Sequence, residues 1–403
     1  TDLADQRAKL TAARIAVNAA LLVPHGAIRR AVIGMADRPP TAAELERMKG
    51  LVKAGMEAGA FGLSSGPYYA PGSYAKTDEL VELAKVAAAG GGLYTSHIRD
   101  ESDYTIGLVA AVDEVITIAE QAKLPGVVTH VKALGPNVWG YSMAVIRRIE
   151  RARARGVEVF ADQYPYDASS TGLSAALVPR WAEVGGDSAM RRRLDDPTEG
   201  PKVRAEMAIN LVRRGGPERQ FIGRHRPDPS IEGKSLAQIA KERGTTPLDA
   251  AIAILKAGGA GIISFNMSED DIAALMKQEW TMTSSDGTLV PMNEGVPHPR
   301  AYGTFPRKLS RYVRERGVVS LEQAIRSMTS LPAGVFRIPD RGVIRAGAKA
   351  DLVVFDLEQV TEKATFAKPH QLSEGMAYVV VNGTVAWDEG KPTGARSGIV
   401  LRR

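Results

Sequence analysis

The chain has 403 residues, enough for two or three domains of roughly 150 residues or for one barrel of about 250 residues with additions. Hydrophobic residues make up 44% and charged residues 24%, which excludes a disordered chain. The formal net charge is +6, and the basic runs lack interleaved aromatic residues, so we expect solvated helix faces and no nucleic-acid partner. The absence of cysteine excludes a disulfide scaffold and a cysteine nucleophile.

No stretch of about 18 apolar residues is present, so the sequence predicts no membrane-spanning helix and no membrane partner. No signal peptide is visible, which favours a cytoplasmic location. Because Thr1 is not an initiator methionine, a preceding segment is also compatible with the sequence.

Short apolar runs alternate with amphipathic helical patterns along the first two thirds of the chain. The expected strands are residues 16–23, 59–63, 91–97, 126–131, 156–162, 261–265 and 280–284. The expected helices are residues 41–58, 78–89, 106–122 and 143–155, and Thr41 with Glu44 predicts a capping box at the first of them. Such alternation predicts parallel strands with helical crossovers, hence an α/β fold.

Two regions interrupt this alternation. Residues 179–227 are charged and poor in strand signals, which predicts an irregular insertion. From residue 337 onward the helical period is lost, and Asn382-Gly383 between two apolar runs predicts a hairpin. We therefore expect a barrel over residues 1–336 and a small β unit over residues 337–403.

Several polar residues follow directly on predicted strands, where the ligands of parallel α/β proteins bind. They are His97, His130, Asp162, Tyr164 and Asp286. A single histidine at a strand end is usually structural, but two on consecutive strands with a late carboxylate favour a divalent metal, with zinc as the first expectation.

Asp286 is the candidate catalytic residue. A zinc-activated water could pass its proton to this carboxylate, which would then protonate a leaving nitrogen. The segment 284–287 also suits a turn, so Asp286 as a helix cap is the alternative. Among the other histidines, we expect His225 in a surface loop and His298 in a rigid turn that aims Arg300.

At these residues the sequence resembles the N-acyl-D-amino-acid deacylases (D-aminoacylases) of the amidohydrolase superfamily. The motifs that carry the resemblance are FGLSSGPYYAPGSYA at 61–75, SHIRDE at 96–101, THVK at 129–132, DQYPY at 162–166, SSDG at 284–287 and HPRAYGTFPR at 298–307. The resemblance covers essentially the whole chain except residues 179–227.

The resemblance implies a (β/α)8 TIM-type barrel with a small β-sandwich, zinc held by His97 and His130, and catalysis by Asp286. It implies that substrate, an N-acyl amino acid, is bound by Lys132, Arg300, Tyr69, Tyr164 and Ser170. Lys132 and Arg300 are also suitable on chemical grounds, because a free α-carboxylate needs cationic partners.

The sequence also departs from the family. It has no His-x-His pair for a first barrel strand and no cysteine ligand, and the matching region begins near the third strand. Two histidines alone make a poor zinc site, and a barrel without its first strands exposes sheet edges. We therefore expect a missing N-terminal segment or a partner chain that completes the barrel.

The leading interpretation is a zinc-dependent hydrolase that splits N-acyl-D-amino acids into a carboxylate and a free D-amino acid. A cyclic amidase, similar to hydantoinase or dihydroorotase, is the second interpretation. A binding chain that has lost the metal and the activity is the third.

Overall fold

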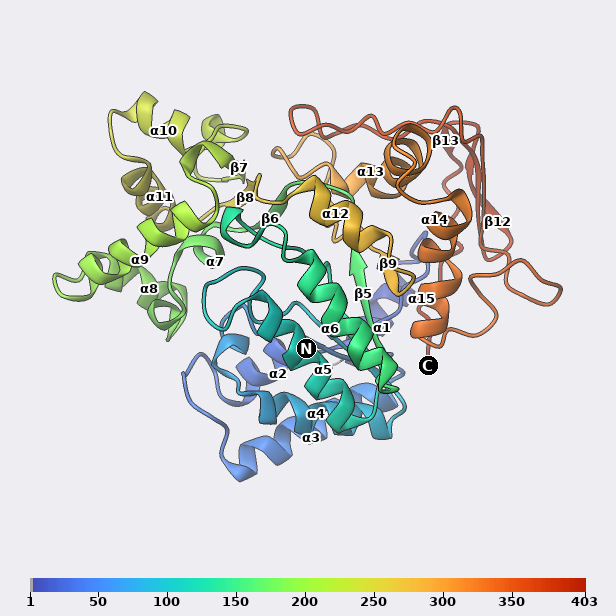
Figure 1. The fold of residues 1–403 in the computed structure, drawn as a ribbon, viewed down its shortest axis with the longest axis horizontal. Coiled ribbons are helices and arrows are strands. Elements are labelled where there is room, and N and C mark those ends of the chain that lie inside the picture. The colour runs from blue at the N-terminus through green and yellow to red at the C-terminus, as the bar shows by residue number, and fades with distance from the viewer. Residues whose placement is uncertain (1–2) are drawn as a thin grey trace.

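The structure is a computed structural model that describes residues 3–403 (Figure 1). Its centre is a six-stranded parallel sheet in the order β1-β2-β3-β4-β5-β9. The strands are β1 (Val23–Pro24), β2 (Gly62–Ser65), β3 (Leu93–Ser96), β4 (Gly126–Val128), β5 (Val159–Gln163) and β9 (Thr281–Thr283). The parallel sheet confirms the predicted α/β fold class.

Helices connect the first five strands and cover one face of this sheet. They are α2 (His25–Val32), α3 (Ala42–Glu57), α4 (Thr77–Ala89), α5 (Leu108–Ala122) and α6 (Ser142–Ala154), preceded by α1 (Leu3–Ala12). Figure 1 shows α3 to α6 side by side, and each packs on the next. The predicted capping box is confirmed, because the Thr41 hydroxyl accepts from the Glu44 amide and the Glu44 carboxylate accepts from the Thr41 amide.

The opposite face of the sheet is covered by a helix from late in the chain. Leu93, Val127 and Met282 from the strands form an apolar cluster with Leu331 and Val335 of α15 (Ser330–Val335). The carboxyl ends of the strands thus remain as the rim on which polar side chains gather.

A long segment lies between β5 and β9, seen in yellow-green at the upper left of Figure 1. It contains β6 (Ser169–Gly172), α7 (Leu173–Leu177), α8 (Asp187–Asp195), α9 (Glu199–Arg213), β7 (Gln220–Arg224), α10 (Leu236–Arg243), α11 (Pro247–Lys256) and β8 (Gly261–Ser264), with α12 (Glu269–Met276) following. Its helices share an apolar cluster of their own, which includes Val203, Met207, Leu236 and Ile254. The segment 179–227, expected to be irregular, therefore contains two full helices and a strand.

The remaining elements lie on the right of Figure 1. After β9 come α13 (Arg300–Arg307), a π-helical continuation over Lys308–Glu315, α14 (Leu321–Met328) and α15. A separate antiparallel sheet contains β10 (Leu352–Phe355), β11 (Met376–Val381), β12 (Thr384–Asp388) and β13 (Lys391–Pro392). The hairpin predicted at Asn382-Gly383 is confirmed, because these residues join β11 to β12 with φ values of 50° and 82°.

Two predicted strands differ from the observed ones. Residues 261–265 do form a strand, β8, but it pairs antiparallel with β6 and β7 instead of joining the parallel sheet. Only the end of the run 16–23 lies in a sheet strand, and Ala19 forms an isolated bridge with Val400. An apolar run predicts a strand but does not specify its partner.

Two further features bear on the sequence expectations. No helix in the described part of the chain is both long and apolar enough to cross a membrane. The division into residues 1–336 and 337–403 stays a prediction.

Candidate metal and substrate site

The two strand-end histidines lie next to each other. His97 follows β3 and His130 follows β4 by two residues, and His97 Nδ1 is 2.8 Å from His130 Nε2. His130 has a φ of 41°, in the left-handed region, and its amide donates to Asp162 Oδ1 at 2.8 Å. Asp162 also accepts from the Ser284 hydroxyl at 2.5 Å, so this strand-end aspartate positions the loops instead of facing the ligand.

A third possible ligand, Glu101, was not anticipated from the sequence. Its Oε1 lies 3.0 Å from His130 Nδ1, and its Oε2 lies 4.0 Å from His97 Nε2. The ligand atoms of the three residues all lie within 4.8 Å of one another. The spacing His97-x-x-x-Glu101 was the available signal. Arg99, which lies between these two residues in the sequence, pairs with Glu114 at 2.7 Å.

Lys132 completes this buried group. Its Nζ lies 2.5 Å from Glu101 Oε1 and 2.7 Å from His130 Nδ1. Burial alone would raise the pKa of Glu101, but the Lys132 ammonium and the two imidazoles hold that pKa well below its usual range. Burial lowers the pKa of His97 well below its usual value, so its imidazole is neutral at pH 7.

The donor set fits a divalent metal ion. Two imidazoles and a carboxylate are a ligand set found in zinc hydrolases. His97 Nε2 is buried and has no hydrogen-bond partner among residues 3–403, as expected for a nitrogen whose natural partner is an ion. Neutral imidazole and anionic carboxylate are also the protonation states that a metal requires.

Asp286 lies beyond β9, and its side chain is 36% exposed. Like His130 it has a left-handed backbone, with a φ of 47°. Arg300 Nη1 lies 2.8 Å from Asp286 Oδ2, an ion pair without the alignment of a hydrogen bond. The Arg300 amide donates to His298 Nδ1 at 3.0 Å, so His298 does help to aim Arg300.

The aromatic and hydroxyl candidates surround these charges. The Tyr164 ring lies under both cations, 4.6 Å from Arg300 Cζ and 5.4 Å from Lys132 Nζ. The Tyr69 ring centre is 4.7 Å from that of His97. The Ser170 carbonyl oxygen accepts from Arg300 Nη2 at 3.4 Å.

One cavity of about 210 Å³ unites all the candidates. The eight residues predicted to bind metal, bind substrate or act in catalysis all line it: Tyr69, His97, His130, Lys132, Tyr164, Ser170, Asp286 and Arg300. Glu101 and Arg214, which the sequence did not point to, line it as well. Their proximity is thus established, and their individual roles stay predictions.

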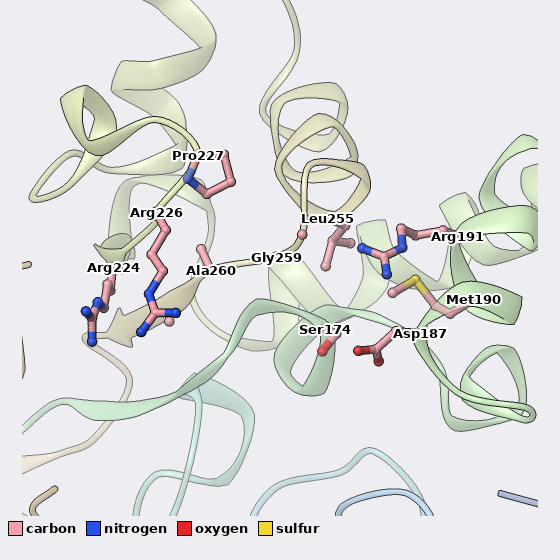
Figure 2. A pocket seen from close by; sticks show the side chains of 12 residues that line it. Ser174, Asp187, Met190, Arg191, Arg224, Arg226, Pro227, Leu255, Gly259 and Ala260 are labelled. Atoms are coloured by element: carbon pink, nitrogen blue, oxygen red, sulfur yellow. The ribbon is translucent and has the colours of Figure 1, made fainter.

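Two further cavities contain arginines, and of these two only the second shares lining residues with the site cavity. The first, of about 610 Å³, lies in the segment between β5 and β9, where Figure 2 shows Arg191 on the α8 side and Arg224 and Arg226 on the opposite side. The second, of about 280 Å³, shares Arg224 with that cavity and Asp286 and Arg300 with the site. Arginines therefore line both of these cavities as well as the site cavity.

His225 corrects a sequence expectation. It was expected in a surface loop but is only 3% exposed, and its Nδ1 lies 2.9 Å from the Gly259 carbonyl oxygen. Its flanking arginines suggested exposure, but burial of the imidazole is compensated by that contact.

The Amidohydro_3 model of the amidohydrolase family matches residues 1–386. The chain belongs to this family. The amidohydrolase is 38% identical over 402 residues to the N-acyl-D-glutamate deacylase of Alcaligenes xylosoxydans xylosoxydans, covering 100% of this chain and 73% of the relative. It is 36% identical over 400 residues to the D-aminoacylase of the same organism, covering 99% of this chain and 73% of that relative.

Solved structures agree with this assignment. The N-acyl-D-glutamate deacylase of Bordetella bronchiseptica, crystallised with zinc and a phosphonate mimic of the tetrahedral intermediate, superposes with a TM-score of 0.84 at 38% identity, over 100% of this amidohydrolase and 75% of that chain. A D-aminoacylase studied for its binuclear metal centre superposes with a TM-score of 0.83 at 34% identity, over 100% of this amidohydrolase and 75% of that chain. The predicted amidohydrolase barrel fold and the resemblance to this enzyme group are confirmed.

The cyclic amidases are more distant. The D-hydantoinase of a Thermus species has 15% identity and a TM-score of 0.50, covering 89% of this amidohydrolase and 70% of that chain, which shows the fold alone. A dihydroorotase of Lactobacillus gasseri matches over 58 residues, 14% of each chain. The second interpretation is therefore supported by distant likeness only.

Proposed function

We propose that this amidohydrolase cleaves N-acyl-D-amino acids to a carboxylate and a free D-amino acid, with zinc held by His97, His130 and Glu101. The observation that carries the proposal is the single cavity in which these three ligands face Asp286 and the cations expected to bind a carboxylate. The preference for D-amino acids rests on the names of the relatives, which are D-aminoacylase and two deacylases of N-acyl-D-amino acids.

The protonation states of His97 and Glu101 suit metal binding. When bound, zinc acidifies water and polarises a carbonyl group. The neutral imidazole of His97 and the anionic carboxylate of Glu101 are ready to hold it without a change of protonation. Asp162 fixes the His130 backbone, so the second imidazole is presented in one orientation.

Asp286 carries the proton. Its carboxylate lines the cavity and pairs with Arg300, which holds it in position. As a C–O bond forms between water and the acyl carbon, Asp286 accepts a proton from that water. It then gives this proton to the amide nitrogen as the C–N bond breaks, which yields the acid and the free amine.

Lys132 and Arg300 hold the α-carboxylate of the substrate. Both are buried, at 3% and 7% exposure, so their attraction for an anion is little screened by water. Tyr164 stacks on Arg300, which limits the positions that the guanidinium can adopt. Tyr69 and Ser170 complete the walls of the cavity around the substrate.

The test is hydrolysis of N-acetyl-D- and N-acetyl-L-amino acids by the purified chain, before and after removal of metal with a chelator. We expect activity on the D-series that chelation abolishes and zinc restores. Turnover of hydantoin without turnover of N-acetyl-D-amino acids would favour the cyclic amidase instead. A protein that neither retains zinc nor gains activity with it would be the inert binding chain.

We also propose that further strands complete the barrel beside β1 or β9. In the described part of the chain, these two strands end the parallel sheet without another parallel partner. Exposed sheet edges favour pairing, so a preceding segment or a second chain fits there. The cytoplasmic location stays a prediction.

A further inference from the structure

The loop that begins with Asp286 leads from the end of β9 to α13. We call residues 286–297 the Asp286 loop, and most of them line the cavity of about 280 Å³ that shares Asp286 and Arg300 with the site. Residues 286–289 and 291–294 are exposed, so burial contributes little to holding the loop. Its position therefore depends on polar contacts with the elements on either side.

On one side the Asp286 loop is attached to β7. The Val296 amide donates to the Gly223 carbonyl oxygen at 2.7 Å, and Arg224 forms an ion pair with Glu294. Because both Arg224 and Glu294 have substantially exposed side chains, at 41% and 45%, the ion pair is screened by water and holds the loop only weakly. The backbone hydrogen bond at Val296 is the stronger of these two attachments.

On the other side the loop is attached to His370, which lies between β10 and β11. His370 Nε2 is 3.0 Å from the Gly295 carbonyl oxygen, and Nδ1 is 2.9 Å from the hydroxyl of Tyr302 on α13. A carbonyl oxygen can only accept, so Nε2 carries the ring proton, and Nδ1 of the neutral ring accepts from Tyr302. With both nitrogens used, one imidazole connects the Asp286 loop to α13.

The segment that carries His370 also holds the far end of α13. Glu362 accepts from Arg307 Nη1 at 2.7 Å and from the Tyr166 hydroxyl at 2.5 Å. Arg307 is the last residue of α13, whereas Tyr302 lies in its first turn. The helix that begins with Arg300 is thus held near both ends by the chain between β10 and β11.

We propose that His370 is a positioning residue that keeps the Asp286 loop in place for proton transfer. The inference rests on the proposed function, in which Asp286 carries the proton. His370 does not line the site cavity, so it acts through the loop and not on the substrate. Proton transfer requires hydrogen-bond distance, so a displacement of Asp286 by roughly 1 Å slows it. The α-carboxylate is bound by Lys132 and Arg300, so substrate affinity should depend less on His370.

Two variants separate the two nitrogens of His370. His370→Gln places an amide N–H near the position of Nε2 and keeps the donor to Gly295, whereas His370→Asn reaches only the position of Nδ1 and loses that donor. For N-acetyl-D-amino acids, we expect His370→Asn to lower kcat by about 10-fold and to change KM by less than about 3-fold. His370→Gln should keep at least about half of the wild-type kcat. Lys368→Ala, at an exposed lysine of the same segment, is the control and should match the wild type.

Hydrogen exchange followed by mass spectrometry measures the loop itself. Peptides covering residues 286–297 should exchange at least about 5-fold faster in His370→Asn than in the wild type or His370→Gln, while peptides from α5 stay unchanged. Unchanged exchange of the loop in His370→Asn would overturn the inference. Equal losses of kcat in both His370 variants, or faster exchange without a loss of kcat, would overturn it as well.

Failure of the proposed function has a different signature. If the wild type hydrolyses no N-acetyl-D-amino acid, the proposed function is wrong, and the exchange comparison, which needs no substrate, decides alone whether His370 holds the loop. Faster exchange in His370→Asn only would support that role. Equal exchange in His370→Asn and His370→Gln would overturn it.

Discussion

Lys132 Nζ lies between Glu101 and His130, 2.5 Å from the carboxylate and 2.7 Å from the imidazole. One buried ammonium thus contacts two of the three candidate metal ligands. Because Lys132 is also expected to bind the substrate carboxylate, metal binding and substrate binding share this side chain. Substitutions in this group should therefore affect metal content and substrate affinity together.

Glu101→Gln should lose metal. The amide keeps the shape of the side chain but removes the negative charge that a divalent ion requires. We expect zinc content to fall well below one ion per chain and kcat/KM to fall by at least about 100-fold. Metal analysis of the purified variant measures the first effect. Glu114→Gln, which changes a buried acid paired with Arg99 outside the cavity, is the control and should retain zinc.

Asp286→Asn should separate chemistry from binding. Asparagine tolerates the left-handed backbone at this position but cannot accept and return a proton. We expect kcat to fall by about 100-fold to 10,000-fold, with zinc content and thermal stability close to those of the wild type. A variant as active as the parent would exclude the proton-transfer role.

Arg300→Lys should weaken substrate binding although the charge is kept. The planar guanidinium lies over Tyr164 and reaches both Asp286 and the Ser170 carbonyl, which a single ammonium cannot reproduce. We expect KM for N-acyl-D-amino acids to rise by about 10-fold to 100-fold, with a smaller change in kcat. Steady-state kinetics on one substrate are sufficient, and an unchanged KM would contradict the assignment.

Lys308 predicts a pH dependence of stability. It is 3% exposed, its Nζ donates to Thr283 Oγ1 at 2.7 Å and Ser327 Oγ at 2.8 Å, and burial lowers its pKa to about 7. Between pH 7 and pH 10.5 the unfolded chain binds more protons than the folded chain, so the free energy of unfolding rises with pH. The destabilisation caused by burying the charged Lys308 is therefore complete below about pH 7 and disappears as pH rises toward 10.5.

Lys308→Met should remove this effect, since the Thr283 and Ser327 hydroxyls also bond to each other at 2.9 Å. We expect the variant to be more stable than wild type by about a few kcal/mol near pH 7, with a difference that shrinks by pH 10. Denaturant unfolding at both pH values measures it. Lys85→Met, at a lysine with a 51% exposed side chain, should show no comparable change.

Much of the site could be anticipated because polar residues that end parallel strands meet at one rim. His97, His130 and Asp286 satisfy that rule, and the structure brings them to one cavity. Glu101 was missed because it follows His97 through an irregular loop, where neither strand nor helix periodicity indicates its direction. Arg214 was missed because it comes from the segment between β5 and β9, whose path over the site no local pattern specifies.

The same distinction applies to the fold. The helices that cover the parallel sheet follow from their amphipathic spacing and caps, as the Thr41–Glu44 box illustrates. The partners of β8 do not follow from its sequence, because an apolar strand pairs equally well in a parallel or an antiparallel sheet. Long-range pairing depends on which surfaces are left to bury after the local elements have formed.

The left-handed backbones of His130 and Asp286 limit how this enzyme can be altered. Branched and bulky residues are disfavoured there irrespective of the reaction, so random mutagenesis at these two codons would mostly sample destabilised protein. Efforts to change the substrate range should leave both codons fixed and diversify the part of the cavity wall that Ser169, Ser170 and Thr171 of β6 form.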